Sequence, residues 1–344
     1  MNRIAVVLFN LGGPDRPEAV EPFLFNLFND PAIIALPNPF RWLLAKTISK
    51  RRAPTAKEIY ANIGGRSPLL PLTEQQAAAL QTELTGKLEA KVFIAMRYWH
   101  PFSTETVAAV KAWKPDKVIL LPLYPQFSTT TSESSIRDWR RAAHAAGFDA
   151  PTVAVCCYPL EKGLIQAQAT AIRAALAEAG KSAPPRVLFS AHGLPKKVIA
   201  KGDPYQQQVE RTAAAVVDAL AVPGLDWIVC YQSRVGPLEW IGPATDAELQ
   251  RAGRDGVAAV VVPIAFVSEH SETLVELDIE YRHLAEAVGV KAYVRVPALG
   301  TDSAFIAGLA RLVEDAAGQT PGRCWAPEHS CAATFGRCAY GTAI

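Results

Sequence analysis

The sequence contains no apolar run long enough to cross a membrane as a helix. Its longest uncharged apolar run extends from Val257 to Val267, whereas a membrane-spanning helix needs about 20 such residues. No targeting segment is evident either, because the short apolar run ending at Phe9 leads into Asn10–Pro14, which is typical of a turn rather than of a cleavage site. We therefore expect a cytoplasmic protein, at most peripheral to the inner membrane.

The sequence also lacks a strong charge of either sign. Its formal net charge is +2 over 344 residues, which is too small to favour nucleic acid or a strongly acidic partner. Half of the residues are hydrophobic and a fifth are charged, as in ordinary globular proteins. At the usual size of about 150 residues per domain, the length predicts two domains. The oligomeric state is left open between a monomer and a homodimer.

Apolar, β-branched runs alternate along the chain with Ala- and Leu-rich amphipathic segments. Continuous apolar runs are typical of parallel strands that are buried on both faces, and strand–helix alternation predicts an α/β fold with right-handed crossovers. The predicted strands are Ile4–Phe9, Val92–Met96, Val118–Leu123, Thr152–Cys156, Val187–Ser190, Trp227–Tyr231, Ala258–Phe266 and Lys291–Val296, and the predicted helices include Thr73–Leu88, Leu164–Ala179 and Gln206–Leu220.

The predicted strands form two sets of four with similar openings, Leu8–Pro14 and Leu188–Pro195. We therefore predict two similar Rossmann-like lobes, residues 1–158 and 159–318, each a four-stranded parallel sheet with helices on both faces. Residues 319–344 form a tail without clear periodicity. Because ligands of open α/β sheets bind beyond the carboxyl ends of strands, we expect both openings to face a shared cleft.

Three glutamates follow the most apolar predicted strand at intervals of four residues. On a helix, Glu272, Glu276 and Glu280 would lie on one face, although like charges at this spacing repel each other mildly. A solvated acidic face is the alternative interpretation. The position at the carboxyl end of a strand favours a ladder that moves protons or cations.

His192 lies in the stretch Ser190–Pro195, where Gly193 and Pro195 predict a turn at the end of a strand. A lone histidine is more often a structural core residue than a catalyst. However, an imidazole presented at such a turn can accept protons near neutral pH, and we predict a catalytic role for it.

Aromatic side chains stand beside cations or hydroxyls in four further stretches. Each stretch alone is typical of a turn, but together they predict a broad aromatic pocket for a flat macrocycle. Arg97 is expected to meet a carboxylate substituent bidentately. The stretches are Tyr60–Pro68, Met96–Pro101, Leu123–Ser128 and Gln232–Trp240.

These stretches, with Asn10–Pro14, Ser190–Pro195 and Pro263–Tyr281, resemble the signature motifs of ferrochelatases, in the family's order, from residue 1 to about 315. Such enzymes insert Fe²⁺ into protoporphyrin IX to form protohaem, the terminal step of haem biosynthesis. The resemblance implies a porphyrin between two lobes, with His192 on one side and Glu272 on the other, both as ligands of the substrate Fe²⁺. It also implies catalytic roles for His270 and Glu276, and porphyrin contacts from Leu11, Tyr60, Ser67, Arg97 and Trp240.

The chemistry of metal insertion agrees with this resemblance. Imidazole and carboxylate suit Fe²⁺ as transient ligands, and a pocket that bends the macrocycle exposes its pyrrole nitrogens. A chelatase for another metal, such as cobalt, or another tetrapyrrole is one alternative, and coproporphyrin stays open beside protoporphyrin. A haem carrier is another alternative, but it would not need the paired His192 and Glu272. The face from which the metal enters is also left open.

Apolar and basic residues are interleaved between Ile33 and Arg52. This composition suits a surface that contacts both an apolar substrate and an anionic membrane. The alternative interpretation is an amphipathic helix packed on its own lobe. The apolar residues are Ile33, Ile34, Leu36, Phe40, Trp42, Leu43 and Leu44, and the basic ones are Arg41, Lys46, Lys50, Arg51 and Arg52.

Three of the six cysteines lie in the tail, with two gaps of six residues and no C-x-x-C pair, unlike common zinc ribbons. We predict a [2Fe–2S] cluster, which usually takes four thiolates, and some ferrochelatases carry one at the C-terminus. Free thiols and a zinc site are the alternatives, and Cys230 is expected in the core. The predicted ligands are Cys157, Cys324, Cys331 and Cys338, with Cys156 as the alternative to Cys157.

Overall fold

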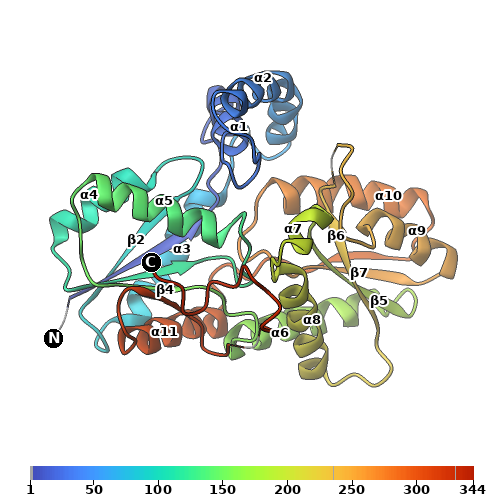
Figure 1. Cartoon of the computed structure of the whole chain (residues 1–344). Coiled ribbons are helices and arrows are strands. Elements are labelled where there is room, and N and C mark those ends of the chain that lie inside the picture. The colour runs from blue at the N-terminus through green and yellow to red at the C-terminus, as the bar shows by residue number, and fades with distance from the viewer. Residues whose placement is uncertain (1–2, 235, 330) are drawn as a thin grey trace. The chain divides into compact units, whose positions relative to one another are not determined.

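The computed structural model describes residues 3–234, 236–329 and 331–344 (Figure 1). The chain folds into two compact units. Unit 1 comprises Met1–Cys157, Leu309–Pro327 and Ala339–Ile344, and unit 2 comprises Tyr158–Gly308 and Glu328–Cys338. Residues 319–344, which the sequence suggested as a separate tail, are therefore shared between the two units.

A parallel sheet forms the centre of unit 1. Its strands are β1 (Ile4–Asn10), β2 (Ala90–Met96), β3 (Lys117–Pro122), β4 (Thr152–Val155) and β9 (Arg323–Trp325), in the order β2-β1-β3-β4-β9. Every residue of β1 is buried, as expected for a central strand covered on both faces. Helices α4 (Ser103–Trp113) and α5 (Ser132–Ala145) cover one face of this sheet (Figure 1). Beside the sheet, Lys87 in the turn after α3 (Leu69–Leu84) forms an ion pair with Glu314 of α11 (Ser303–Ala317).

The prediction of four strands in this sheet was wrong, because within the described residues it has five. The fifth strand, β9, comes from the tail and pairs in parallel with β4, placing Cys324 opposite Ala154. An edge strand has unpaired backbone groups, and β9 supplies partners for those of β4. Three residues are too few to show a periodicity, so β9 could not be predicted from the sequence.

Helices α1 (Val20–Phe28) and α2 (Phe40–Ala61) form a pair that stands off the sheet of unit 1 (Figure 1). The short helix η1 (Pro17–Ala19) leads into α1. Phe23 and Leu24 of α1 pack in one cluster with Tyr60 of α2 and with Tyr98 and Trp99, which follow β2. This cluster joins the helix pair to the end of the sheet.

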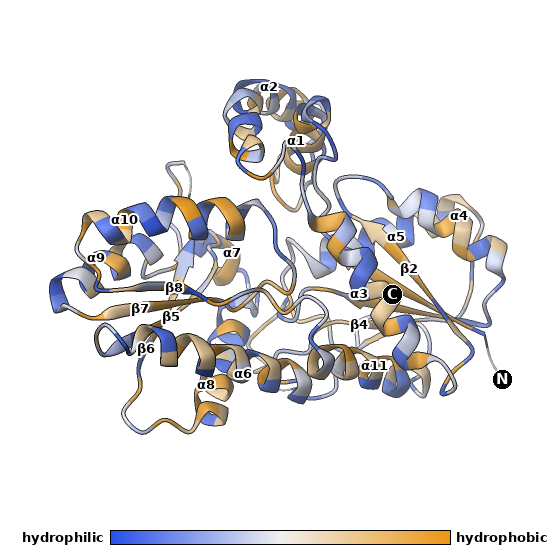
Figure 2. Cartoon of the chain, turned by 180° about the vertical axis from the view of Figure 1, so that it is seen from behind, coloured by the Kyte–Doolittle hydropathy of each residue, from blue (hydrophilic) through white to orange (hydrophobic). Residues whose placement is uncertain are grey.

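Unit 2 has a second parallel sheet, with strands β5 (Pro185–His192), β6 (Asp226–Gln232), β7 (Ala258–Pro263) and β8 (Tyr293–Arg295) in the order β6-β5-β7-β8. Helices α6 (Lys162–Ala179) and α8 (Tyr205–Leu220) pack on one face. The other face carries α9 (Thr245–Asp255), η2 (Glu272–Glu280) and α10 (Tyr281–Ala287). In Figure 2, hydrophilic (blue) and hydrophobic (orange) residues alternate along α6 and α8, as expected for amphipathic helices. A short helix, α7 (Lys196–Ala200), follows β5.

The structure confirms the predicted α/β fold with parallel sheets. The strands differ from their predicted limits by a few residues at their ends. Within the described ranges, no helix is both long enough and apolar enough to traverse a lipid bilayer.

Candidate active site

His192 is the last residue of β5 and lies opposite Gln232 at the end of β6. The turn predicted at His192 thus begins one residue later, at Gly193, whose backbone N–H donates to Gln232 O at 2.9 Å. The His192 Nδ1 atom lies 2.6 Å from Gly193 O. A carbonyl oxygen can only accept, so this contact assigns the proton to Nδ1 and leaves the Nε2 lone pair of neutral His192 free to accept another.

The carboxylate of Glu272 lies between two imidazoles. Its Oε1 atom is 3.6 Å from His192 Nε2, and its Oε2 atom is 3.8 Å from His270 Nε2. Gln232 Nε2 donates to the backbone oxygen of Glu272 at 3.1 Å and so fixes the start of η2 beside β6. Three of the predicted catalytic residues are thus brought together. No set of three or more His, Cys, Asp or Glu side chains in the described part of the chain is arranged to hold a metal ion.

His270 has an environment different from that of His192. Its ring packs edge-on against Phe266, with the ring centroids 4.5 Å apart. Burial lowers the pKa of the His270 imidazole, and this effect outweighs the nearby Glu272 carboxylate, which acts to raise it. His270 is therefore neutral at pH 7, which is the form of histidine that binds metal ions.

The three glutamates of the ladder lie on η2, which is a π-helix rather than the α-helix implied by the four-residue spacing. A π-helix has i→i+5 hydrogen bonds and is frequently found at functional sites. Glu272 is partly buried, Glu276 is partly buried and Glu280 is exposed. The ladder therefore extends from the imidazoles toward solvent.

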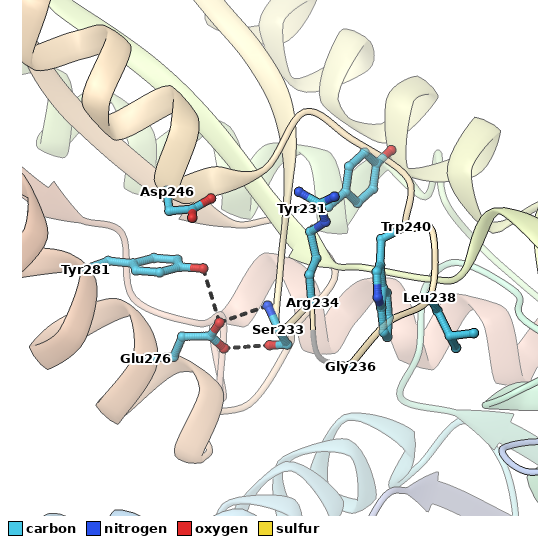
Figure 3. Close-up of a pocket in the computed structure, with 9 residues that line it drawn as sticks. All are labelled: Tyr231, Ser233, Arg234, Gly236, Leu238, Trp240, Asp246, Glu276 and Tyr281. Atoms are coloured by element: carbon cyan, nitrogen blue, oxygen red, sulfur yellow. Dashed lines mark hydrogen bonds between the residues drawn. The ribbon is translucent and has the colours of Figure 1, made fainter.

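Glu276 accepts hydrogen bonds from several donors (Figure 3). The Ser233 N–H donates to Oε1 at 2.8 Å, the Ser233 hydroxyl and Gln232 Nε2 donate to Oε2, and the Tyr281 hydroxyl donates to Oε1 at 3.2 Å. Burial and the neighbouring Glu272 nevertheless raise the pKa of Glu276, because these donors compensate only in part. A carboxylate with a raised pKa is a better proton acceptor near neutral pH.

Glu276 also lines a polar pocket of about 360 Å³. Trp240 lies on one side of this pocket and Tyr281 on the other (Figure 3). The backbone of Trp240 forms an antiparallel β-bridge with Pro195. A Cβ atom at Gly193 would lie 3.3 Å from the indole ring of Trp240. The glycine after His192 thus allows the indole to lie close to the catalytic strand end. The lining residues are Tyr231, Ser233, Arg234, Gly236, Leu238, Trp240, Asp246, Glu276 and Tyr281.

Of the four predicted porphyrin contacts of unit 1, Leu11, Ser67 and Arg97 lie in loops, and Tyr60 lies near the end of α2. Tyr98 N donates to Leu11 O at 2.9 Å, which joins the turn after β1 to the segment after β2. Ser67 N donates to Pro14 O at 2.7 Å, and Gly13 approaches Ser67 so closely that a Cβ atom there would lie 2.4 Å from the Ser67 hydroxyl. Leu11 and Tyr60 pack in the same apolar cluster.

Arg97, for which a substrate contact is predicted, is held within unit 1 by two side chains. Its Nη2 atom donates to Asp30 Oδ2 at 2.7 Å and its Nε atom to Ser134 Oγ at 2.8 Å. Asp30 also accepts from the hydroxyls of Tyr98 and Ser134. Burial would raise the pKa of Asp30, but Arg97 and these donors lower it. Asp30 was missed, because a single Asp in the sequence has no pattern.

Four of the six cysteines lie in two pairs, and Cys156 Sγ also lies 3.9 Å from Cys157 Sγ. In unit 1, Cys324 is buried on β9 beside β4, where burial raises its pKa to about 12 and the nearby Cys157 adds to this rise. In unit 2, the Cys338 thiol hydrogen-bonds to Cys331 and, with Gln208, lowers the Cys331 pKa to about 6. Cys230 is fully buried on β6, as predicted.

Comparison with known proteins identifies the family. The ferrochelatase family model matches residues 3–317 of this chain. The chain belongs to the ferrochelatase family. A ferrochelatase of Caulobacter vibrioides strain NA1000 is 58% identical over 323 residues, covering 93% of this chain and 92% of the relative. A ferrochelatase of Phenylobacterium zucineum is 55% identical over 343 residues, covering 98% of each.

A solved structure of SirB from Bacillus subtilis with Fe³⁺ has a TM-score of 0.56 at 12% sequence identity, covering 92% of this chain and 96% of SirB. This likeness confirms the chelatase-like fold. The family match confirms the predicted enzyme class: the chain is a ferrochelatase, a metal chelatase of haem synthesis.

The raised pKa of Glu276 predicts how this ferrochelatase's stability depends on pH. A carboxyl group with a raised pKa in the folded state contributes stability that is present below the unfolded value of about 4.3 and is lost as the pH rises through the folded pKa. Relative to Glu276→Gln, the metal-free wild type should therefore lose stability as the pH rises above about 4 and through the folded pKa. Thermal unfolding at a series of pH values measures this difference.

Glu269→Gln is the matched control, because the folded pKa of Glu269 is lowered: burial would raise it, but Thr273 and Arg295 outweigh burial. The wild type should gain stability over this variant as the pH rises through the folded pKa of Glu269 to the unfolded value of about 4.3, and the difference should stay constant at higher pH. Slopes of the same sign for the two variants would contradict the assignment.

Proposed function

We propose that this chain inserts Fe²⁺ into protoporphyrin IX to give protohaem, with His192 and Glu272 as the central catalytic groups. The observation that supports this proposal best is the carboxylate of Glu272 between two imidazoles at the start of an acidic ladder. Two imidazoles and a carboxylate are donors that suit Fe²⁺. The reaction releases two protons for each iron inserted, so the site needs both a proton acceptor and a route to solvent.

His192 is the proposed acceptor of the pyrrole protons. Its Nε2 lone pair is free because Nδ1 is held by Gly193 O. Once protonated, the imidazolium is stabilised by the Glu272 carboxylate 3.6 Å away. The proton then passes along Glu272 and Glu276 to the exposed Glu280 and to water.

His192 and Glu272 are the proposed transient donors for the substrate Fe²⁺, with neutral His270 beside them. Glu276 keeps its place through the donors of Ser233 and Tyr281, and its raised pKa suits it to accept a proton and release it again. We propose that Trp240, Leu11, Tyr60 and Ser67 contact the macrocycle. Arg97 acts in this scheme by holding Asp30 and the end of α1.

The test is turnover of variants of the two central groups. His192→Ala and Glu272→Ala should each lower the rate of haem formation by about 10²–10⁴-fold, because each removes a proton-transfer group. Porphyrin binding, measured by fluorescence, should be retained because it rests mainly on apolar contacts. The assay supplies protoporphyrin IX and Fe²⁺ anaerobically and follows the visible spectrum, with coproporphyrin and Co²⁺ in parallel arms.

His283→Ala and Glu286→Ala are matched controls, since both residues are exposed on α10 of the same unit. They should turn over at the wild-type rate. Near-normal turnover of either central variant would remove that residue from the mechanism, and a clear preference for coproporphyrin or cobalt would overturn the substrate assignment.

We also propose that the helix pair α1–α2 makes a peripheral contact with anionic membrane. Its apolar residues are strongly exposed: Phe40 has 66%, Leu43 has 60% and Trp42 has 44% of its surface exposed. The exposed Arg51 and Arg52 follow on α2. Exposed apolar side chains beside basic ones are typical of surfaces that enter the lipid headgroup region. The chain would then work in the cytoplasm, at the inner membrane.

Charge reversal tests the membrane contact. Lys50→Glu, Arg51→Glu and Arg52→Glu together should abolish flotation with phosphatidylserine-containing vesicles, because each basic residue near an anionic surface contributes about 1 kcal/mol. The same number of reversals at the exposed Lys111, Lys181 and Lys201 is the control and should leave flotation unchanged. Equal flotation of both triple variants would rule out the proposal.

We propose further that Cys157, Cys324, Cys331 and Cys338 bind a [2Fe–2S] cluster. A [2Fe–2S] cluster usually takes four thiolates, two on each iron, and the predicted set supplies four thiols. The lowered pKa of Cys331 favours the thiolate that binds iron, and the proximity of Cys157 to Cys324 favours it over Cys156. When bound, the cluster would stabilise the C-terminal segments, since metal-binding energy becomes folding energy.

The cluster proposal predicts a coloured protein. Chain purified anaerobically should be reddish-brown with acid-labile sulfide equal to its non-substrate iron, and Ser at any of the four positions should bleach it. Cys230→Ser, in the core of unit 2, is the control that should keep the colour. A colourless wild type with zinc, or with no metal, would refute the cluster without touching the chelatase assignment.

A further inference from the structure

Nine residues of π-helix are unusual, because longer i→i+5 runs are rare and most occur as single turns. Something beyond η2 itself must hold this backbone. Strand β8 supplies side chains to it: the Tyr293 hydroxyl donates to Leu277 O at 2.6 Å. Arg295 of the same strand reaches Asp278 on η2.

Arg295 joins two carboxylates on either side of the catalytic residues. Its Nε atom donates to Asp278 Oδ1 at 2.9 Å and its Nη2 atom to Asp278 Oδ2, so this contact is bidentate. Its Nη1 atom donates to Glu269 Oε1, which also accepts from Ala298 N at 2.9 Å. The arginine side chain is only 10% exposed.

The two carboxylates bound by Arg295 flank the catalytic residues in the sequence. Glu269 directly precedes His270, and Asp278 follows Glu276 by two residues. Fixing Glu269 and Asp278 to one rigid guanidinium therefore fixes the segment that carries His270, Glu272 and Glu276. Arg295 is also always charged, so it offsets the repulsion among the half-buried carboxylates of this segment.

We infer that Arg295 is a positioning residue that sets the distance of His270 and Glu272 from His192. This inference rests on the roles proposed above for those three residues. Arg295 itself need not touch iron or porphyrin. It holds Glu269 and Asp278, which flank the side chains that do, and loss of outer partners of this kind typically lowers metal affinity or activity by about 10–100-fold.

The experiment compares Arg295→Met and Arg295→Lys with a matched control, Arg186→Met. Arg186 is also a buried arginine of unit 2 that joins two carboxylates, with Nε 2.7 Å from Asp226 and Nη1 2.8 Å from Asp255. It lies near the start of β5, whereas His192 lies at its end. Both Met variants lose a double ion pair, so their losses of stability should be similar.

Anaerobic assays with Fe²⁺ and protoporphyrin IX should show a change in kcat without a change in porphyrin binding. Arg295→Met should lower kcat by about 10–100-fold, with the porphyrin dissociation constant unchanged. Arg295→Lys keeps the charge and should recover part of that loss. Arg186→Met should retain the wild-type kcat once folded.

Several outcomes would overturn the inference. One is a folded Arg295→Met with wild-type kcat, and another is an equal loss in Arg186→Met. If Arg295→Met does not fold, Asp278→Asn decides, and a wild-type kcat there would refute the positioning role. An inactive wild type, or an active Glu272→Ala, would instead be a failure of the proposed function.

Discussion

Half-buried carboxylates close to one another are unfavourable unless each has donors or a cation beside it, and unit 2 has four of them within ten residues, at 269, 272, 276 and 278. The structure meets this constraint separately for each. Glu272 lies between two imidazoles, Glu276 accepts from Ser233 and Tyr281, and Arg295 joins the remaining two. The positions of β6, β8 and η2 all follow from these contacts.

The hydrogen bonds to Glu276 only partly offset its burial and the repulsion from Glu272. This partial offset indicates what Glu276 does. A fully compensated carboxylate would be a poor proton acceptor at neutral pH, whereas the pKa of Glu276 is raised. By contrast, the pKa of Glu269 is lowered, which suits a residue that only anchors. The surroundings of Glu269 therefore suit it to anchoring, and those of Glu276, seven residues later, suit it to proton transfer.

Much of this arrangement could be predicted from the sequence, because the strand ends are marked by local patterns. The long apolar runs indicated the parallel strands, and glycine with proline marked the turn after His192. The π-helix could not be predicted, since the spacing of Glu272, Glu276 and Glu280 fits an α-helix equally well. Asp30 and Arg295 were also missed, because their importance comes from partners distant in the sequence, such as Arg97 for Asp30.

The place of β9 has a consequence for the order in which the chain can fold during synthesis. Unit 1 begins at the first residues but is completed only by Leu309–Pro327 and Ala339–Ile344. The ribosome therefore releases Tyr158–Gly308 of unit 2 before the edge of β4 can be covered. Until then the nascent chain carries an exposed strand edge, the kind of surface on which unfinished proteins aggregate. We expect the last residues to decide whether a newly made molecule stays soluble.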